Sequence, residues 1–308
     1  MKILITGGAG YVGTSLTQLL LSQGHQVKVM DNLMFGGDPL LPFFRNEHFE
    51  FMKGDVRNET DVTHAMNNQD AVVHLAAIVG YPACRKEPGL AEEVNITGTQ
   101  NIARLASKNQ IVLFASTGSN YGAVEDICSE ETPLNPLSLY AQTKVRGEKI
   151  ISDNANGIVF RFATGFGISP RFRLDLLIND FVYKAVSQGY LVIYEKNFKR
   201  SFIHVHDMAR AFLFGIEHAD TMAGEVYNVG SESMNYTKEE ICNSIKSKID
   251  YYVHYADVGE DADKRNYQVS YKKINALGFK TTVSVDSGID ELAKASRILF
   301  AKTPYGNV

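Results

Sequence analysis

The sequence lacks several features that mark particular classes of protein. It has no tryptophan, no run of basic residues and only three cysteines, Cys84, Cys128 and Cys242. The cysteines have neither metal-ligand nor redox spacing, so no metal site is predicted, and their odd number with no leader predicts free thiols in a reducing cytoplasm. The formal net charge is −4, which argues against a nucleic-acid partner and against binding to an anionic membrane.

Long apolar runs are also missing. No stretch approaches the roughly 20 apolar residues that span a bilayer, and the chain opens on a strand-like segment where a signal peptide would stand. With 44% hydrophobic and 21% charged residues, the composition is that of an ordinary globular protein. We therefore expect a cytoplasmic protein, with 308 residues arranged as one large domain or two interlocked ones.

The first residues contain the most informative pattern in the chain. The apolar segment 2–6 ends at Gly7, Gly10 and Gly13 follow at intervals of three, and residues 14–22 have helical periodicity. Glycines at a strand-to-helix turn let the backbone approach a pyrophosphate, and the helix N-terminus offers it free N–H groups. The pattern predicts a dinucleotide site.

A second strand, 26–30, closes on Asp31. A carboxylate at this place can accept hydrogen bonds from both ribose hydroxyls, and it would repel a 2′-phosphate. We therefore predict NAD in preference to NADP.

Strands and helices alternate as far as residue 162, which predicts an α/β fold with a doubly wound parallel sheet. We expect an NAD-binding domain over 1–165, with 200–220 returning to it, and a smaller mixed α/β substrate lobe over 166–308. His74 is predicted to be a core residue and 78–90 a loop. Asp55 follows a strand end, where it can accept from the adenine amino group or cap the next helix. Other elements are expected as strands at 49–53, 71–77, 111–115, 158–162, 191–194 and 200–205 and helices at 59–66, 91–107, 176–188, after the N-cap Asp207, 237–249 and 285–299.

Tyr140 and Lys144 lie four residues apart after the helix cap Ser138, and so share one helical face. A phenol has a reference pKa of about 10. A neighbouring ammonium and a positively charged nicotinamide ring favour the phenolate. They thereby lower the pKa of the phenol toward neutrality, where it is useful as a general base. Thr117, at the end of a neighbouring strand, is placed to hold a substrate hydroxyl. Together the three residues predict oxidation of an alcohol with transfer of a hydride to NAD.

With these motifs in place, the sequence resembles the extended short-chain dehydrogenases/reductases of the nucleotide-sugar epimerase/dehydratase family. The matching stretches run in the family's order: 7–13, 31–33, 54–57, 74–77, 116–117, 140–144 and 200–207. The resemblance implies a Rossmann domain, a nucleotide-sugar lobe, tightly held NAD and a homodimer. It implies that Tyr140 is the base, that Lys144 orients it and binds ribose, and that Thr117 holds the sugar hydroxyl.

The pattern and the resemblance together give the predicted binding residues. For the cofactor these are Gly7, Gly10, Tyr11, Val12, Asp31, Asn32, Asp55, Val56, Leu75, Ala76, Ala77, Asn95, Ser116, Tyr140 and Lys144. For the substrate they are Val79, Thr117, Thr164, Arg171, Arg173, Asn179, Arg200 and Arg265. The alternative is a surface salt bridge for Arg200 and Arg265, a place on the lobe surface for Arg171 and Arg173, and a hydrogen bond to a neighbouring loop for Asn95.

The sequence departs from the family pattern at two places. In the 4,6-dehydratases an Asp-Glu pair follows the hydroxyl residue, whereas here Gly118 and Ser119 follow Thr117, and the next carboxylate is Glu125. This difference argues against elimination of water. Thr164 stands where the family often has an Asn that binds the diphosphate, which indicates rearranged diphosphate contacts.

Five further stretches, 31–35, 75–80, 167–171, 174–177 and 263–267, resemble the GDP-manno-heptose 4-dehydrogenases of this family. The predicted substrate is therefore a nucleotide sugar, with GDP favoured over UDP, oxidised at C4. The residues do not separate a 4-dehydrogenase from a 4-epimerase, since epimerisation adds only rotation of the ketone and return of the hydride. A 4-keto-sugar reductase and a non-catalytic NAD-binding scaffold remain as alternatives.

Overall fold

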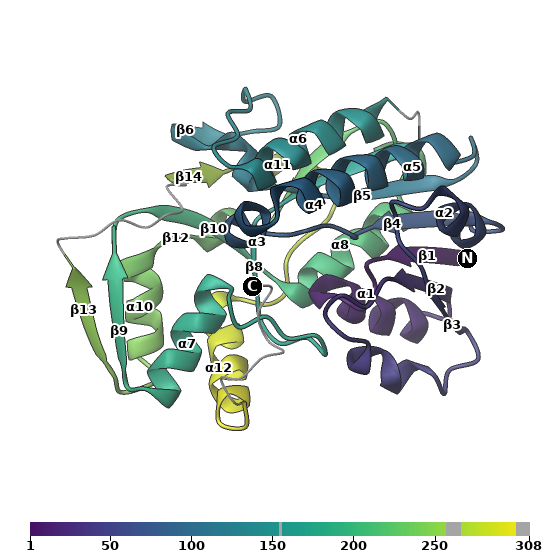
Figure 1. The fold of residues 1–308 in the computed structure, drawn as a ribbon. Coiled ribbons are helices and arrows are strands. Elements are labelled where there is room, and N and C mark those ends of the chain that lie inside the picture. The colour runs from purple at the N-terminus through teal and green to yellow at the C-terminus, as the bar shows by residue number, and fades with distance from the viewer. Residues whose placement is uncertain (154–155, 257–265, 300–308) are drawn as a thin grey trace.

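The computed structural model of the chain describes residues 1–153, 156–256 and 266–299 (Figure 1). Its centre is a parallel sheet of seven strands in the order β11-β7-β5-β4-β1-β2-β3. The strands are β1 (Lys2–Thr6), β2 (Gln26–Asp31), β3 (Phe49–Lys53), β4 (Ala71–His74), β5 (Ile111–Thr117), β7 (Gly157–Phe162) and β11 (Val226–Val229). The doubly wound Rossmann sheet predicted from the alternation of elements is confirmed.

Helices cover both faces of this sheet because its central strands are apolar on both sides. One face packs against α1 (Tyr11–Ser22) and α8 (Val205–Glu217) in one hydrophobic cluster. The opposite face packs against α2 (Glu59–Met66), α5 (Gly98–Leu105) and α6 (Leu139–Ser152) in a second cluster. His74 is buried between these layers, with its ring nitrogens hydrogen-bonded to Thr6 and Thr99, as expected of a core residue.

The segment predicted to be a loop over 78–90 is largely helical. It forms α3 (Tyr81–Lys86) and begins α4 (Pro88–Glu92). The segment contains Pro82 and Pro88, and each lies in the first turn of its helix, where proline is favoured because its missing N–H needs no partner. The predicted helix 91–107 is α4 and α5 joined by one π-helical turn, η2 (Glu93–Thr97).

The second part of the molecule has small sheets and its own core. β10 (Lys199–His204) pairs with β8 (Thr164–Phe166) and β12 (Asn235–Thr237), and β9 (Tyr190–Tyr194) pairs with β13 (Tyr252–Ala256). The helices α7 (Leu177–Ser187), α10 (Lys238–Lys246) and α12 (Val285–Ser296) enclose a third hydrophobic cluster. Shorter elements are η1 (Asp38–Phe43), η3 (Gly118–Tyr121), β6 (Ala123–Cys128) paired with β14 (Asn266–Val269), α9 (Ala219–Met222), η4 (Glu232–Met234) and α11 (Lys272–Ala276).

The chain crosses between the two parts more often than a single boundary allows. After β8, α7, β9 and β10 it returns as α8 and then as β11, the edge strand of the large sheet, so the return extends beyond the predicted 200–220. The predicted N-cap of α8 was wrong. His204 caps the helix by accepting from the backbone N–H of His206, and Asp207 lies inside the first turn. Its buried carboxylate accepts hydrogen bonds from Arg210 and from the backbone of Thr282 and Val283.

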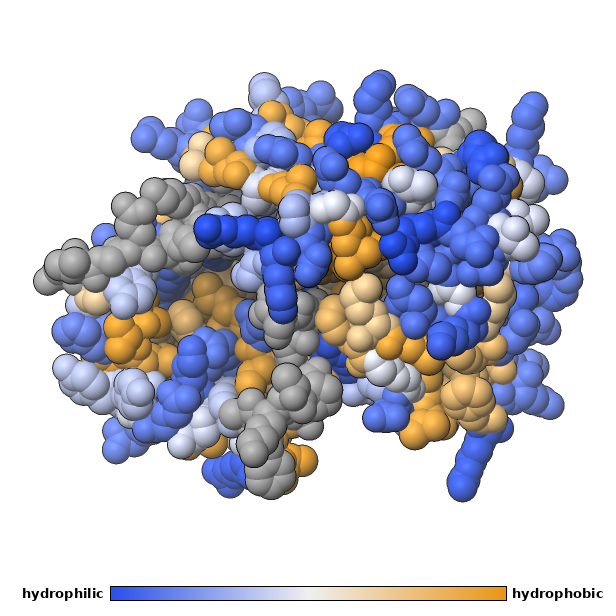
Figure 2. Space-filling view, viewed as in Figure 1, coloured by the Kyte–Doolittle hydropathy of each residue, from blue (hydrophilic) through white to orange (hydrophobic). Residues whose placement is uncertain are grey.

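Hydrophilic residues cover most of the face seen in Figure 2, and hydrophobic residues form separate patches on it. Among the described residues, no helix is long and apolar enough to cross a membrane, and no cluster of His, Cys, Asp and Glu is arranged to hold a metal ion. The three cysteines are buried and unpaired.

Candidate active site

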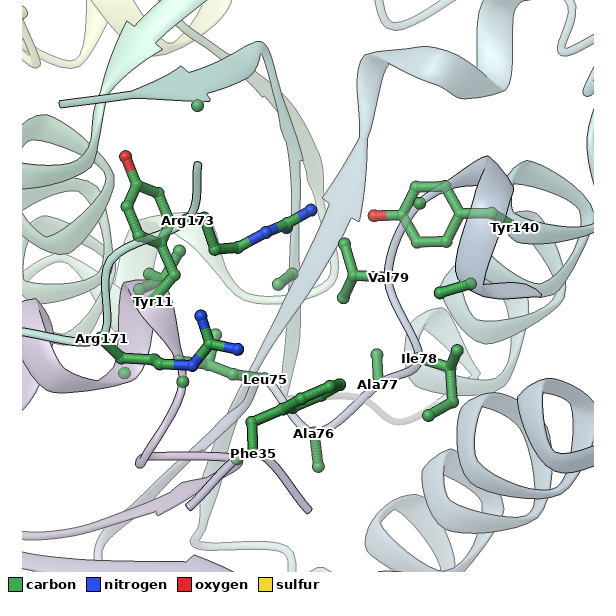
Figure 3. Close-up of a pocket in the computed structure, with 18 of the residues that line it drawn as sticks. Tyr11, Phe35, Leu75, Ala76, Ala77, Ile78, Val79, Tyr140, Arg171 and Arg173 are labelled. Atoms are coloured by element: carbon green, nitrogen blue, oxygen red, sulfur yellow. The ribbon is translucent and has the colours of Figure 1, made fainter. Parts of the chain in front are cut away.

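A cavity of about 620 Å³ lies at the carboxyl ends of the central strands, between the two parts of the molecule (Figure 3). In open parallel sheets, ligands bind at this edge. Almost all predicted site residues line the cavity: Gly7, Gly10, Tyr11, Val12, Asp31, Asn32, Asp55, Val56, Leu75, Ala76, Ala77, Val79, Ser116, Thr117, Tyr140, Lys144, Thr164, Arg171, Arg173 and Arg200.

The glycine turn between β1 and α1 is too tightly packed for side chains. A Cβ on Gly7, whose φ is +70°, would lie 2.6 Å from the backbone nitrogen of Ala76, and a Cβ on Gly13 would lie 2.6 Å from the Cα of Gly8. Gly10 caps α1 without any side-chain hydrogen bond, so the N-terminus of a 12-residue helix faces the cavity. This arrangement fits a pyrophosphate, which needs a close backbone and free N–H groups.

Asp31 is fixed at the end of β2. Its carboxylate accepts from the backbone N–H groups of Ala9 at 3.0 Å and Leu33 at 2.8 Å. Burial raises the pKa of Asp31, and the two backbone donors oppose that effect. A rigid carboxylate beside the glycine turn fits the hydroxyls of a ribose.

Asp55, at the next strand end, is a residue whose role the sequence left open. It binds the Arg57 guanidinium at 2.8 and 3.0 Å, and this pairing lowers the pKa of Asp55 to about 2. The helix-cap alternative was wrong, because Asn58 caps α2 by accepting from the N–H groups of Thr60 and Asp61. Asp55 lines the cavity.

Thr117, Tyr140 and Lys144 meet at the same cavity from two elements, β5 and α6. Ser138 caps α6 as predicted, accepting from the N–H of Ala141 at 3.2 Å. The Lys144 side chain is buried, with its ammonium 4.7 Å from the centre of the Phe114 ring. Burial lowers the pKa of Lys144 to about 8, while the neighbouring Cys84 and Glu148 oppose that shift.

The substrate-lobe side of the cavity is basic. Figure 3 shows Arg173 and Tyr140 pointing toward one another across the cavity near Val79. Arg173 forms an ion pair with Asp175, and the Arg171 guanidinium lies 5.2 Å from the centre of the Phe35 ring. The hydroxyl of Thr164 is buried and has no hydrogen-bond partner in the described part of the chain.

Hydrogen bonds from distant elements hold the loop that contains Arg171 and Arg173. The Tyr11 hydroxyl, which points away from the cavity, donates to the Gly167 carbonyl at 2.9 Å (Figure 3). Ser169 bonds to the Thr14 hydroxyl at 2.8 Å, and Glu291 of α12 accepts from the N–H of Ile168. The dinucleotide turn and the arginine loop are therefore joined directly.

Two predicted binding residues, Asn95 and Asn179, do not line the cavity. The Asn95 amide bonds to both backbone groups of Ile78 and to Thr143, and the Asn179 amide holds the backbone of Gly167 and Arg173. Each amide is hydrogen-bonded to the backbone of a segment that borders the cavity. Both residues therefore hold lining segments in place and do not themselves line the cavity. Arg265 lies outside the described residues.

Sequence reasoning missed several lining residues, among them Phe35 and Asp180. Asp180 lies in the first turn of α7 and pairs with Lys184 at 2.7 Å, while burial raises its pKa. An acidic residue in a first turn is common in any helix, and nothing in the local sequence separates this one from an exposed residue. Phe35 follows the conspicuous Asp31-Asn32 pair, so its proximity in sequence to Asp31 was the available indication.

The NAD dependent epimerase/dehydratase family matches residues 3–230, and the chain belongs to this family. It is 28% identical to a CDP-paratose 2-epimerase of Salmonella typhi, over 95% of this chain and 98% of that protein. It is 29% identical to a dTDP-glucose 4,6-dehydratase of Streptomyces niveus, over 94% of this chain and 91% of that protein. The predicted family and its NAD dependence are thereby confirmed.

Solved structures agree on the fold. A UDP-glucose 4-epimerase of Thermus thermophilus in complex with NAD has a TM-score of 0.81 at 24% identity, with 96% of this chain and 99% of that chain covered. A UDP-glucuronic acid 4-epimerase of Bacillus cereus, in complex with UDP-glucuronic acid and NAD, has a TM-score of 0.86 at 24% identity, covering 97% and 100%. Within the family the chain is therefore an NAD-dependent enzyme of the nucleotide-sugar epimerase/dehydratase class.

Proposed function

We propose that this enzyme oxidises C4 of a nucleotide sugar without eliminating water, as a 4-dehydrogenase of the GDP-manno-heptose type or as a 4-epimerase. One observation carries the proposal: Thr117, Tyr140 and Lys144 line one cavity with the glycine turn, and no carboxylate directly follows Thr117 in the chain. A base, a hydroxyl-binding residue and a cofactor site are the parts that an oxidation needs.

The cofactor half of the cavity has the groups that NAD requires. The backbone of the glycine turn and the α1 N-terminus are suited to the pyrophosphate, Asp31 to one ribose, and Lys144 to the other. NAD, when bound, accepts the hydride from the sugar carbon. Asn95 and Cys84 both hydrogen-bond the backbone of Ile78 and so hold the 75–80 segment beside the cofactor space.

Residues of β5 and α6 bind the sugar hydroxyl and remove its proton. Thr117 holds the sugar hydroxyl, and the Tyr140 phenolate removes its proton as a general base. The Lys144 ammonium stabilises this phenolate, because an opposite charge nearby favours the ionised form. Since the Lys144 pKa is lowered to about 8, the ammonium persists at neutral pH and is lost at moderately alkaline pH.

A 4,6-dehydratase needs a further acid and base to eliminate water, and its Asp-Glu pair directly follows the hydroxyl residue. This chain has Gly118 and Ser119 at those two positions. The Ser119 hydroxyl accepts a hydrogen bond from the Thr117 hydroxyl at 3.0 Å, and a serine has no ionisable group to offer. On the substrate-lobe side of the cavity, Asp175 is paired with Arg173 and Asp180 with Lys184. These pairings support oxidation over dehydration.

The basic residues of the substrate lobe fit a diphosphate. Arg171, Arg173 and Arg200 all line the cavity, and guanidinium groups match phosphate geometry well. The GDP preference and the heptose rest on the sequence resemblance at 31–35, 75–80, 167–171, 174–177 and 263–267. The named relatives act on CDP-, dTDP- and UDP-linked sugars, so GDP is the part of the proposal most in need of a direct assay.

The test is an incubation of the purified protein with GDP-manno-heptose and with GDP-, UDP-, CDP- and dTDP-hexoses. The near-ultraviolet absorbance of NADH and NMR of the sugar are followed, after mass spectrometry of any nucleotide that co-purifies. A 4-keto product with net NADH indicates a dehydrogenase, and a C4 epimer without net redox change indicates an epimerase. A 4-keto-6-deoxy product would contradict the proposal.

Two alternatives have distinct results in the same assay. A 4-keto-sugar reductase uses the same groups in reverse and would consume NADH with a 4-keto sugar. A non-catalytic NAD-binding scaffold would show no turnover, and Tyr140→Phe would change nothing measurable. The proposed homodimer is checked by light scattering of the eluted protein.

A further inference from the structure

Behind the cavity, the buried carboxylate of one residue, Glu148, joins helix α6 to strands β5 and β7 of the sheet and to η3. Glu148 of α6 forms an ion pair with Arg161 of β7, with two guanidinium nitrogens 2.8–3.1 Å from its oxygens. The Oε1 atom of Glu148 also accepts from the Ser116 hydroxyl at 2.5 Å and from the Asn120 amide at 2.6 Å. The side chains of Glu148 and Arg161 are only 6% and 7% exposed.

The position of this carboxylate relative to the reacting groups is informative. Glu148 follows Lys144 by one helical turn and Tyr140 by two, so it sits on nearly the same side of α6. Ser116, which it binds, directly precedes Thr117 at the end of β5. The base and the hydroxyl-binding residue come from different elements, and Glu148 is a direct side-chain link between those elements.

We propose that Glu148 is a positioning residue for the oxidation: through Ser116 it fixes Thr117 at its distance from Tyr140, and its charge supports the ammonium of Lys144. The inference rests on the proposed function, since it assigns Glu148 a part in that same chemistry. Glu148 does not line the cavity, and it acts through its neighbours only.

A purely structural role would be the simpler interpretation, but two features argue against it. A buried ion pair is a costly way to stabilise a fold, because desolvation of the charges offsets their attraction. Here the carboxylate uses its remaining acceptor capacity on Ser116 and Asn120, at the strand end that bears Thr117. The Glu148 charge also raises the pKa of Lys144, opposing burial and adding to the effect of Cys84.

The two roles are separable by variants of the full-length, NAD-loaded enzyme. Glu148→Gln removes the charge and also disrupts the network, because an amide NH2 replaces the oxygen that accepts from Arg161. Ser116→Ala retains the charge and removes only the link to β5. For Glu148→Gln we expect kcat to fall about 10- to 100-fold, since small misplacements of reacting groups cost that much. The KM for the nucleotide sugar should be unchanged, and the alkaline limb of the kcat profile should move to lower pH. Ser116→Ala should lower kcat at every pH without moving that limb.

Asp207→Asn is the matched control. Asp207 is another fully buried carboxylate that accepts several hydrogen bonds, and it does not line the cavity. Its loss should lower the melting temperature and leave kcat and the pH profile unchanged. Wild-type kcat and an unmoved alkaline limb in Glu148→Gln would overturn the proposal, as would the same changes in Asp207→Asn.

A second measurement needs no substrate. Lysine labelled with ¹³C at Cε gives a Lys144 signal, assigned by its absence in Lys144→Arg, that is titrated in the NAD-bound protein. A lower pKa in Glu148→Gln than in the wild type supports the electrostatic part, and an equal pKa overturns it. If Glu148→Gln does not fold, Ser116→Ala decides the geometric part, and wild-type kcat in that variant contradicts it. Absence of turnover in the wild type with every nucleotide sugar would contradict the proposed function instead, while the titration would still test Glu148.

Discussion

The two halves of the cavity are built in different ways. The cofactor half consists of strand ends and one turn, in which short contiguous motifs such as 7–13 and 75–77 supply most of the lining. The substrate half depends on a loop, 167–173, held by Tyr11, Thr14 and Glu291 from elements far away in the chain. A site built from local motifs keeps its geometry when its neighbours change, whereas a site held by long-range bonds is where relatives can come to differ in substrate.

The largest expected effect on kcat comes from Tyr140, which lies where the cofactor half and the substrate half of the cavity meet. Tyr140→Phe removes the proposed base while keeping the ring, so kcat should fall about 10²- to 10⁴-fold, the range for general base catalysis. NAD affinity, measured by fluorescence titration, should change little because Phe retains the ring packing. Retention of more than half of the wild-type rate would indicate that another group takes the proton.

Lys144→Met separates catalysis from stability. The ammonium is buried and its pKa is lowered to about 8, so the folded state binds this proton less tightly than the unfolded chain. Replacing Lys144 with a neutral side chain of similar length should therefore raise the melting temperature while kcat falls about 100-fold. In the wild type the same shift predicts that the free energy of unfolding increases as pH rises from about 8 to the ordinary lysine pKa. In Lys144→Met this increase should be smaller over the same pH range.

Asp31→Asn tests the cofactor half alone. Loss of the charge weakens the hydrogen bonds expected to the ribose, and a hydrogen bond to a charged group is worth about 1.5–3 kcal/mol, so the Kd for NAD should rise roughly tenfold or more. The Kd for NADP should fall in the same variant because the repulsion of a 2′-phosphate is removed. Isothermal titration with both dinucleotides measures the two Kd values. An unchanged preference for NAD over NADP would show that Asp31 does not select the cofactor.

The smallest expected effect concerns the substrate half. Thr164→Val removes a buried hydroxyl that has no partner among the described residues, which should stabilise the free protein by about 1 kcal/mol. If this hydroxyl binds the sugar or diphosphate, KM should rise several-fold with kcat and NAD affinity unchanged. Thermal unfolding and initial rates report the two changes, and an unaltered KM would place Thr164 outside the substrate contacts.

Sequence reasoning located residues at strand ends correctly but misassigned residues whose side chains bond distant backbone, and the reason is physical. Parallel strands place their carboxyl ends at one edge, so residues such as Asp31, Ala76 and Thr117 could be located from strand boundaries alone. Asn95 and Asn179 were predicted to bind the cofactor and the substrate, with a hydrogen bond to a neighbouring loop as the alternative for Asn95. Their amides bond the backbone of Ile78 and Gly167. These pairings join residues 17 and 12 positions apart, and no local pattern encodes them.

The helical 81–92 segment and the buried network around Glu148 show the same limit. A proline in the first turn of a helix cannot be told from a proline in a loop by the sequence alone, and only the packing of the segment distinguishes the two. Glu148 was unremarked in the sequence because an acidic residue on a helix is usually exposed. Its function as a link depends on Arg161 and Ser116 reaching the same point from other strands.

The central claim is that C4 of the sugar gives its hydrogen to the cofactor while the sugar keeps all its oxygen. The most direct test is mass spectrometry of the cofactor and of the sugar product after reaction with a nucleotide sugar deuterated at C4. The proposed function predicts a product that has not lost water, with the deuterium on the nicotinamide ring of the reduced cofactor for a dehydrogenase, or back on C4 of the epimerised sugar for an epimerase. Loss of the C4 deuterium to solvent during conversion, or a product that has lost water, would contradict it.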